Sequence, residues 1–166
     1  MASPAETAAF LSGTRLFAQV DRRDLTALAE RLTEHSMRKG QVVMRQGEHG
    51  EEMFVVRRGK LVISKQVTGN VEQILARAGE GDFFGEMALF DRSPRSATIQ
   101  AETEAMLLVL DRDNLGRLTQ DNPRAAAAFF HALVLIFIER LRASGELVAE
   151  VTRWGLEATG LDVEAR

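Results

Sequence analysis

One short stretch of the sequence combines an acid, an arginine and several small residues: FFGEMALFDRSPRSAT, residues 83–98. Glu86 follows a glycine, and Arg95 follows a proline. A carboxylate accepts hydrogen bonds from sugar hydroxyls, whereas a guanidinium presents a fork of donors that matches two phosphate oxygens. The pair therefore suits a nucleotide, with Glu86 on the sugar and Arg95 on the phosphate. The alternative is an ordinary salt bridge between these two side chains on a surface loop.

The residues between the two charges predict a backbone anion site. EMALF, which follows Gly85, can form a single helical turn whose first N–H groups have no partner within the turn. Those donors and the helix dipole both favour negative charge. The small residues Gly85 and Ala88 let a ligand approach the backbone closely. Pro94 is predicted to fix the turn that delivers Arg95, and Ser96 adds a hydroxyl beside it.

The elements before this stretch are predicted to be helices and then strands. Residues 1–35 are expected to be helical, because the apolar residues of RRDLTALAERL recur at spacings of three and four. Asp21 suits the N-cap of that helix, and Asp24 places negative charge in its first turn.

From Ser36 to Asp111 the sequence changes to short apolar runs that glycine interrupts about every ten residues. This rhythm predicts an antiparallel sandwich or barrel. Arg58-Gly59 and Gly69-Asn70 are predicted tight turns, because glycine adopts positive φ without steric cost. Three runs alternate as half-buried strands do: Met53 with Val55, Leu61 with Ile63, and Ala97 with Ile99 and Ala101.

Residues 112–157 are predicted to be helical again. Asp111 can cap DNLGRLTQ, and Asn122-Pro123 supplies the N-cap and first residue of a long helix. That helix is expected to run to about Trp154, where Gly155 offers a stop.

The long helix carries two apolar seams, and one is enough to pack it on the strands. A parallel copy of the same helix would cover the second seam, so we expect a homodimer through this helix. The alternative is that both seams pack inside one monomer. One seam is Phe130, Val134, Phe137, Leu141, Ser144, Val148 and Val151, and the other is Phe129, Leu133, Ile136, Arg140, Ala143, Leu147, Glu150 and Trp154.

Two motifs, Gly85-Glu86-Met87-Ala88-Leu89 and Pro94-Arg95-Ser96-Ala97-Thr98, together resemble the phosphate-binding cassette of the cyclic nucleotide-binding domain family. This module is found in catabolite activator-type regulators, in kinase regulatory subunits and in cyclic-nucleotide-gated channels. The resemblance extends to LFAQVDRRDLTALAERL, VVMRQGEHGEEMFVVRRGKLVIS and DRDNLGRLTQDNP. It therefore covers roughly residues 14–157.

The resemblance implies a mainly β fold with flanking helices. The expected architecture is an antiparallel β-roll, a jelly-roll-like double-stranded β-helix, with N-terminal helices and a long C-terminal helix. The whole chain is expected to form one cyclic nucleotide-binding domain. Its expected parts are N-terminal helices over 1–35, a roll over 36–111 with the cassette at 83–98, C-terminal helices over 112–157 and a tail over 158–166.

The resemblance also gives roles to the matching residues. It implies that Glu86 accepts a hydrogen bond from the ribose 2′-hydroxyl and that Gly85 lies beside the sugar. The backbone N–H groups of Met87 and Ala88 are expected to face the cyclic phosphate. Arg95 is expected to neutralise that phosphate.

The base is less well specified. Ser96 is expected to add donors, and it follows the arginine at a position where a threonine typically helps recognise guanine in the family. Ala97 completes the expected ligand-binding set. If Arg140-Leu141 matches the corresponding pair in dimeric members, a second base contact falls on Ser144. The alternative for Ser144 is a polar residue that only sets the helix register. Cyclic AMP and cyclic GMP therefore both remain candidate ligands.

Composition argues against several other classes of protein. The 166 residues carry a net charge of −3, so the chain has no basic footprint for nucleic acid, and they include no cysteine. His35, His49 and His131 are too scattered for a metal site of the kind that β-roll enzymes hold. No pattern of catalytic residues is present, so we expect neither an enzyme nor a cofactor other than the nucleotide ligand.

The predicted location is cytoplasmic, with no membrane span and no secretory signal. The residues after the long helix, 155–166, are too few to form a helix-turn-helix, so direct DNA binding is not expected unless the chain belongs to a longer protein. The leading hypothesis is a stand-alone cyclic nucleotide sensor that changes the position of its C-terminal helix and is read by an unknown protein partner. The alternative is a fold that has lost its ligand and serves for dimerisation or interaction.

Overall fold

The computed structural model describes residues 2–67 and 71–158, with side chains as far as residue 154, and divides them into two units. The first unit ends at Phe129 and contains all the described strands. The second begins at Phe130 and continues the long helix α4. The predicted turn at Gly69-Asn70 and most of the predicted tail lie outside the described residues.

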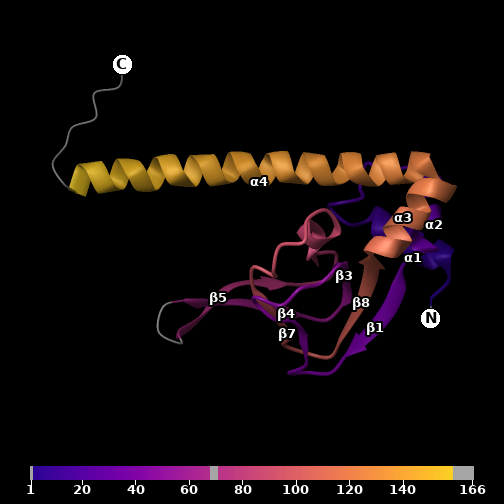
Figure 1. Ribbon diagram of the computed structural model, residues 1–166, viewed down its shortest axis with the longest axis horizontal. Coiled ribbons are helices and arrows are strands. Elements are labelled where there is room, and N and C mark those ends of the chain that lie inside the picture. Colours follow the sequence, from indigo (N-terminus) through magenta and orange to yellow (C-terminus); the bar gives the residue numbers. More distant parts are fainter. Residues whose placement is uncertain (1, 68–70, 159–166) are drawn as a thin grey trace, which may run out of the picture. The chain divides into compact units, whose positions relative to one another are not determined.

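Eight strands of the first unit form two antiparallel sheets of four (Figure 1). The order is β1-β8-β3-β6 in one sheet and β2-β7-β4-β5 in the other. This confirms the predicted antiparallel roll with flanking helices. The strands are β1 (Thr33–Met37), β2 (Val42–Met44), β3 (Glu52–Arg58), β4 (Leu61–Val67), β5 (Val71–Ala78), β6 (Phe83–Phe84), β7 (Thr98–Ala101) and β8 (Ala105–Asp111).

The core lies between the inner faces of the two sheets. The rings of Phe54 and Phe84 stack at its centre with centroids 5.1 Å apart. Alternation holds in β7, where Ile99 and Ala101 are buried, but it fails in β3, where every residue from Met53 to Val56 is buried. The prediction of a half-buried strand is wrong there because the short helix η1 (Glu86–Leu89) packs on β3. The core cluster is Phe54, Val56, Leu61, Ala78, Phe84, Ile99, Leu107 and Val109.

Two helices precede the strands. Helix α1 (Pro4–Ser12) starts with a capping box in which Glu6 accepts hydrogen bonds from Ser3, and those bonds lower the pKa of Glu6. Helix α2 (Arg22–Ala29) is capped by Asp21, as predicted. Strand β1 begins at Thr33, so the expectation that the chain is helical to residue 35 is wrong. The last residues of that segment pair with β8 instead.

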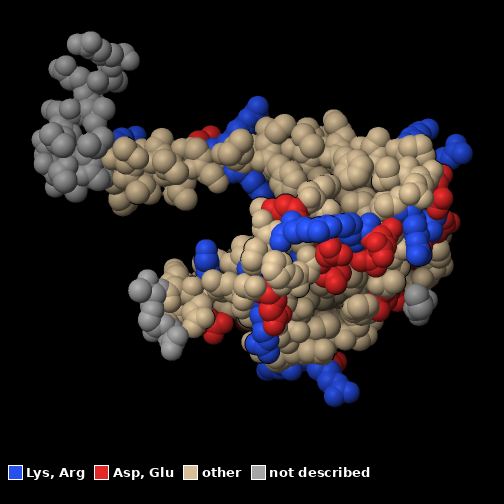
Figure 2. All heavy atoms as spheres, in the orientation of Figure 1, with Lys and Arg blue, Asp and Glu red and all other residues tan. Residues whose placement is uncertain are grey.

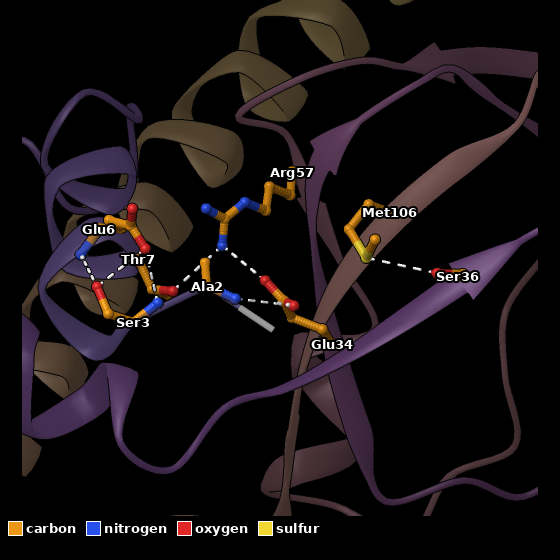
Figure 3. A network of polar contacts seen from close by, with 8 residues as sticks. All are labelled: Ala2, Ser3, Glu6, Thr7, Glu34, Ser36, Arg57 and Met106. Atoms are coloured by element: carbon orange, nitrogen blue, oxygen red, sulfur yellow. Dashed lines mark hydrogen bonds and ion pairs between the residues drawn. The ribbon is translucent and has the colours of Figure 1, made fainter.

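A polar network joins the N-terminal segment to the sheet that contains β1 and β3 (Figure 3). Arg57 in β3 donates from Nη1 to Oε1 of Glu34 at 2.8 Å and to the hydroxyl of Thr7 at 3.2 Å. The backbone N–H of Ala2 donates to the other carboxylate oxygen of Glu34 at 3.2 Å. Arg57 also lies over the ring of Phe10, 5.8 Å from its centroid. Helix α1 is therefore fixed to two strands by one arginine.

Two helices follow the strands. Asp111 caps α3 (Arg112–Asp121), and Asn122 accepts from the N–H of Ala125 at the start of α4 (Pro123–Ala158), as predicted. Phe129 packs in the first unit, with its ring 6.1 Å from that of Phe17. The expected stop at Gly155 is wrong, because α4 continues through this glycine to Ala158. One glycine costs a helix only about 1 kcal/mol relative to alanine.

The part of α4 in the second unit exposes large apolar side chains over most of its described length. Figure 2 shows this helix mostly tan, with few charged side chains on the visible face. No helix in the described part of the chain is long and apolar enough to cross a membrane. Among the side chains of residues 130–154, the exposed large apolar ones are Val134, Leu135, Ile138, Leu141, Leu147, Val148, Val151 and Trp154.

Candidate ligand-binding site

The turn predicted after Gly85 is present as the 3-10 helix η1. Gly85 precedes it with φ of 77°, a left-handed conformation that glycine adopts readily. The N–H of Ala88 donates to the carbonyl of Gly85 at 3.2 Å, so the expectation that this N–H lacks an internal partner is wrong. By the geometry of a 3-10 turn, the N–H groups of Glu86 and Met87 have no carbonyl within the helix.

The guanidinium of Arg95 is buried and held on two sides. Nη1 donates to the backbone carbonyl of Glu52 at 2.9 Å and to that of Gly85 at 3.3 Å. Nη2 donates to Oε2 of Glu52 at 2.8 Å. The Arg95 side chain is only 5% exposed, whereas that of Glu52 is 42% exposed. A fixed cation therefore lies directly beside the left-handed Gly85.

Two glycines leave the space that the guanidinium occupies. A Cβ added to Gly50 would lie 2.3 Å from Nη2 of Arg95, and one added to Gly85 would lie 2.9 Å from Nη1. Real Cβ atoms do not approach other heavy atoms within 3.0 Å, so both positions need glycine while Arg95 keeps this position. On a third side, the guanidinium lies 5.8 Å from the ring centroid of Phe54.

The other predicted site residues are placed as follows. Glu86 is buried, with only 5% of the residue exposed, and Ala88 and Ala97 are buried as well. Met87 and Ser96 are exposed. The cassette therefore combines buried charged side chains with a mostly buried turn from which Met87 is exposed.

The sequence reasoning missed the partners of Arg95. It considered a salt bridge between Glu86 and Arg95 on a surface loop, whereas the carboxylate that pairs with Arg95 belongs to Glu52 and the guanidinium is buried. Gly50 was also missed. The run GEHGEE, residues 47–52, carried the only signal, a glycine directly before two acids at the start of a strand.

A cavity of about 400 Å³ adjoins Arg95, a volume within the range of small-molecule sites. Its polar lining residues are His35, Gln41, Glu48, His49, Glu52 and Arg95. Its apolar wall comes from β1, β2, β3 and β8 and includes Met37, Val43, Met44, Phe54, Leu107 and Val109. A buried cation next to a cavity with both polar and apolar lining suits a ligand that carries an anionic group and other polar groups.

The histidines and Ser144 lie apart from one another along the chain. His35 and His49 are exposed in the first unit, and His131 is exposed on α4 in the second. Within residues 2–67 and 71–158, no three acidic, histidine or cysteine side chains form a group that could hold a metal ion. Ser144 is an exposed residue of α4 in the second unit, so its role at the base stays a prediction.

The fold and the cassette together define a small-ligand-binding β-roll. The family model described as "Cyclic nucleotide-binding domain" matches residues 34–122, more than half of the chain. The chain therefore belongs to the cyclic nucleotide-binding domain family. The match begins in β1 and ends at Asn122, so it includes the roll, the cassette and α3.

Relatives of the chain include a regulator of transcription and a regulatory subunit of a cyclic-nucleotide-dependent kinase. The CRP-like cAMP-activated global transcriptional regulator of Mycobacterium tuberculosis is 27% identical over 85% of this chain. The chain spans 61% of that regulator's length. The cAMP-dependent protein kinase regulatory subunit of Blastocladiella emersonii is 31% identical over 72% of this chain and 30% of its own length.

Solved structures give the same family. The catabolite activator protein of Thermus thermophilus superposes with a TM-score of 0.75 and 26% identity, over 84% of this chain and 63% of its own. The regulatory domain of Toxoplasma gondii PKA, solved with cAMP, superposes with a TM-score of 0.65 and 26% identity, over 70% of this chain and 45% of its own.

Proposed function

We propose that this chain is a cyclic nucleotide sensor that binds cyclic AMP or cyclic GMP at residues 83–98. The observation that carries the proposal is the buried guanidinium of Arg95, held beside the left-handed Gly85 at the start of η1. A desolvated arginine offers a phosphate charge-assisted hydrogen bonds that are about twice as strong as neutral ones. Family membership supports the same ligand class.

Each cassette residue has a proposed role. Arg95 neutralises the cyclic phosphate, while the backbone N–H groups at Met87 and Ala88 approach it. For Ala88 this requires that its N–H either breaks its hydrogen bond to the Gly85 carbonyl or divides it between that carbonyl and the phosphate. Glu86 accepts from the ribose 2′-hydroxyl, and Gly85 lies beside the sugar. Burial of Glu86 supports this role, because water then competes less for the carboxylate.

Ser96, Ala97 and Ser144 are proposed to complete the site around the base. Ser96 is exposed and follows Arg95 directly, so its hydroxyl can reach a ligand held by the guanidinium. Ala97 is buried and provides a small wall.

The proposed role is regulatory rather than catalytic. The relatives support this, since they include a transcriptional regulator and a kinase regulatory subunit. The transcriptional role in the first name is not carried over, because the chain matches only part of that protein. We propose instead that ligand binding changes the position of the C-terminal helix, which an unidentified protein partner then reads.

A paired calorimetric titration with cyclic AMP and cyclic GMP tests this function. We expect saturable one-to-one binding of at least one nucleotide, because the site offers a desolvated cation and a sugar acceptor. The linear nucleotide 5′-AMP is the matched control, since it carries the same base and sugar with a different phosphate geometry. Absence of binding of both cyclic nucleotides at millimolar concentration would reject the proposal.

A second candidate function is a ligand-free interaction domain. The observation that favours it is the hydrogen bond from Nη2 of Arg95 to the Glu52 carboxylate, which already neutralises part of the positive charge of Arg95. In that case Arg95 is a structural residue, and neither cyclic nucleotide raises the thermal midpoint. A ligand at one hundred times its dissociation constant adds about 2.7 kcal/mol to the free energy of unfolding.

The exposed apolar residues of α4 support a homodimer through this helix. Leu141 and Val148 belong to the same predicted seam and are both exposed. We expect sedimentation of the ligand-saturated chain to give the mass of a dimer. The double substitution Leu141→Glu with Val148→Glu should halve that mass, because it places carboxylates in an apolar seam.

The control for the dimer experiment is Arg142→Glu, which adds a carboxylate to the same helix outside both seams. It should leave the dimer intact. A monomeric wild-type chain at high concentration with ligand present would contradict the dimer and would leave the binding proposal unaffected.

A further inference from the structure

Arg112, the first residue of α3, contacts the far end of the cassette. Its Nη2 donates to the backbone carbonyl of Ala88 at 2.6 Å and to that of Asp91 at 2.9 Å. These carbonyls belong to the C-terminal end of η1 and the turn after it. Arg112 lies more than twenty residues after these carbonyls in the sequence, and its hydrogen bonds link the start of α3 to the cassette.

Glu51 holds Arg112 in place. Nη1 of Arg112 lies 3.1 Å from Oε1 of Glu51, and the backbone N–H of Arg112 donates to the Glu51 carbonyl at 3.0 Å. The N–H of Glu51 in turn donates to Oε2 of Glu52 at 3.0 Å, the same oxygen that accepts from Arg95. An unbroken series of contacts therefore runs from Arg95 through the two acids to Arg112 and back to the cassette.

The position of the Arg112 side chain carries a cost in stability. The Nε of Arg112 is buried and has no hydrogen-bond partner among the described residues. A buried donor without a partner lowers the stability of the fold, and such groups are few in native structures. The Nη atoms of the same side chain make the contacts to the cassette and to Glu51.

We propose that Arg112, held by Glu51, is a positioning residue for the cyclic nucleotide site. By fixing the carbonyl end of η1, it keeps the opposite end of the turn and Gly85 against the guanidinium of Arg95. This inference rests on the proposed function and adds a residue outside the cassette to the site. Arg112 touches no ligand; it acts on the ligand only through the backbone of residues 85–91.

The chain offers a matched control in Arg31. Its side chain is 28% exposed against 26% for Arg112, and it also has a buried Nε without a partner in the described structure. It pairs with Asp121 at the other end of α3, away from the carbonyls of Ala88 and Asp91 that Arg112 holds. Arg31→Gln therefore removes the same kind of group, and one contact to α3, without releasing η1.

The test is amide hydrogen exchange on the full ligand-free chain, followed by titration with cyclic AMP and cyclic GMP as probes. Arg112→Gln should speed the exchange of a peptide covering 85–91 about tenfold, while Arg31→Gln should leave it unchanged. Arg112→Gln should also weaken binding of the nucleotide that wild type binds by about tenfold, with Arg112→Lys in between. Adding Glu51→Gln to Arg112→Gln should cause no further loss, because the two residues act as a unit.

The hydrogen-exchange arm needs no ligand, so it separates this inference from the proposed function. If wild type binds neither nucleotide, the proposed function fails while the exchange of residues 85–91 still reports on positioning. Equal exchange of this peptide in Arg112→Gln and Arg31→Gln would overturn the positioning role, whatever the affinities are.

Discussion

Replacing Arg95 by glutamine is expected to weaken binding of the preferred cyclic nucleotide by about 10- to 150-fold. This range corresponds to the 1.5–3 kcal/mol that a hydrogen bond to a charged group contributes. The guanidinium is 5% exposed, so water replaces it poorly, and glutamine offers no charge to the phosphate. Calorimetric titration of the variant against wild type measures the change.

The fold should survive this substitution. Loss of Arg95 leaves the Glu52 carboxylate without its cation, but that side chain is 42% exposed and can be hydrated. A thermal midpoint within a few degrees of wild type is therefore expected. Arg45→Gln is the matched control, since Arg45 is an exposed arginine whose ion pair with Glu48 lies in the loop between β2 and β3. If Arg95→Gln and Arg45→Gln bind equally well, Arg95 is not the phosphate ligand.

Replacing Gly85 by alanine is expected to abolish measurable binding and to lower the free energy of unfolding by about 3 kcal/mol. The left-handed φ of 77° is strained for any residue with a Cβ. The added Cβ would also lie 2.9 Å from both Nη1 of Arg95 and the backbone carbonyl of Glu52. The backbone oxygen cannot move aside as a flexible side chain can, so the cassette itself must shift.

Gly40→Ala separates the two causes. Gly40 has a similar φ of 82°, but a Cβ there would meet nothing within 4 Å. Gly40→Ala should therefore lower the free energy of unfolding only by the cost of the left-handed backbone, about 1–2 kcal/mol. It should keep full affinity for the nucleotide. Chemical denaturation and titration of both variants measure the difference. Equal losses at the two glycines would mean that the contact between Gly85 and Arg95 is unimportant.

The roll was predictable because its signals are local. Glycine-punctuated apolar runs predicted antiparallel strands, and Asp21, Asp111 and Asn122 marked helix starts that the structure confirms. The failures have tertiary causes. Residues 33–35 carry no strong strand pattern and become β1 by pairing with β8. Met53–Val56 looked half-buried because sequence alone cannot tell which strand a later helix will cover.

Only the cassette part of the candidate site, residues 83–98, could be predicted from the sequence. The cassette residues lie within one stretch, so their spacing and their resemblance to a family could be read directly. The partners of the cassette come from segments distant in sequence: Gly50 and Glu52 lie more than forty residues before Arg95, and Arg112 follows it by seventeen. Pairing across such distances depends on sheet order and strand register, which residue types do not specify.

The chain has a single tryptophan and no tyrosine, and that tryptophan is Trp154, 67% exposed on α4 in the second unit. Its indole is therefore the sole source of tryptophan fluorescence, and it lies in the helix for which a ligand-dependent change of position is proposed. Any shift in emission on adding nucleotide would report on the surroundings of that helix without an attached label. Quenching by iodide would likewise measure whether the same surface becomes covered when the ligand binds.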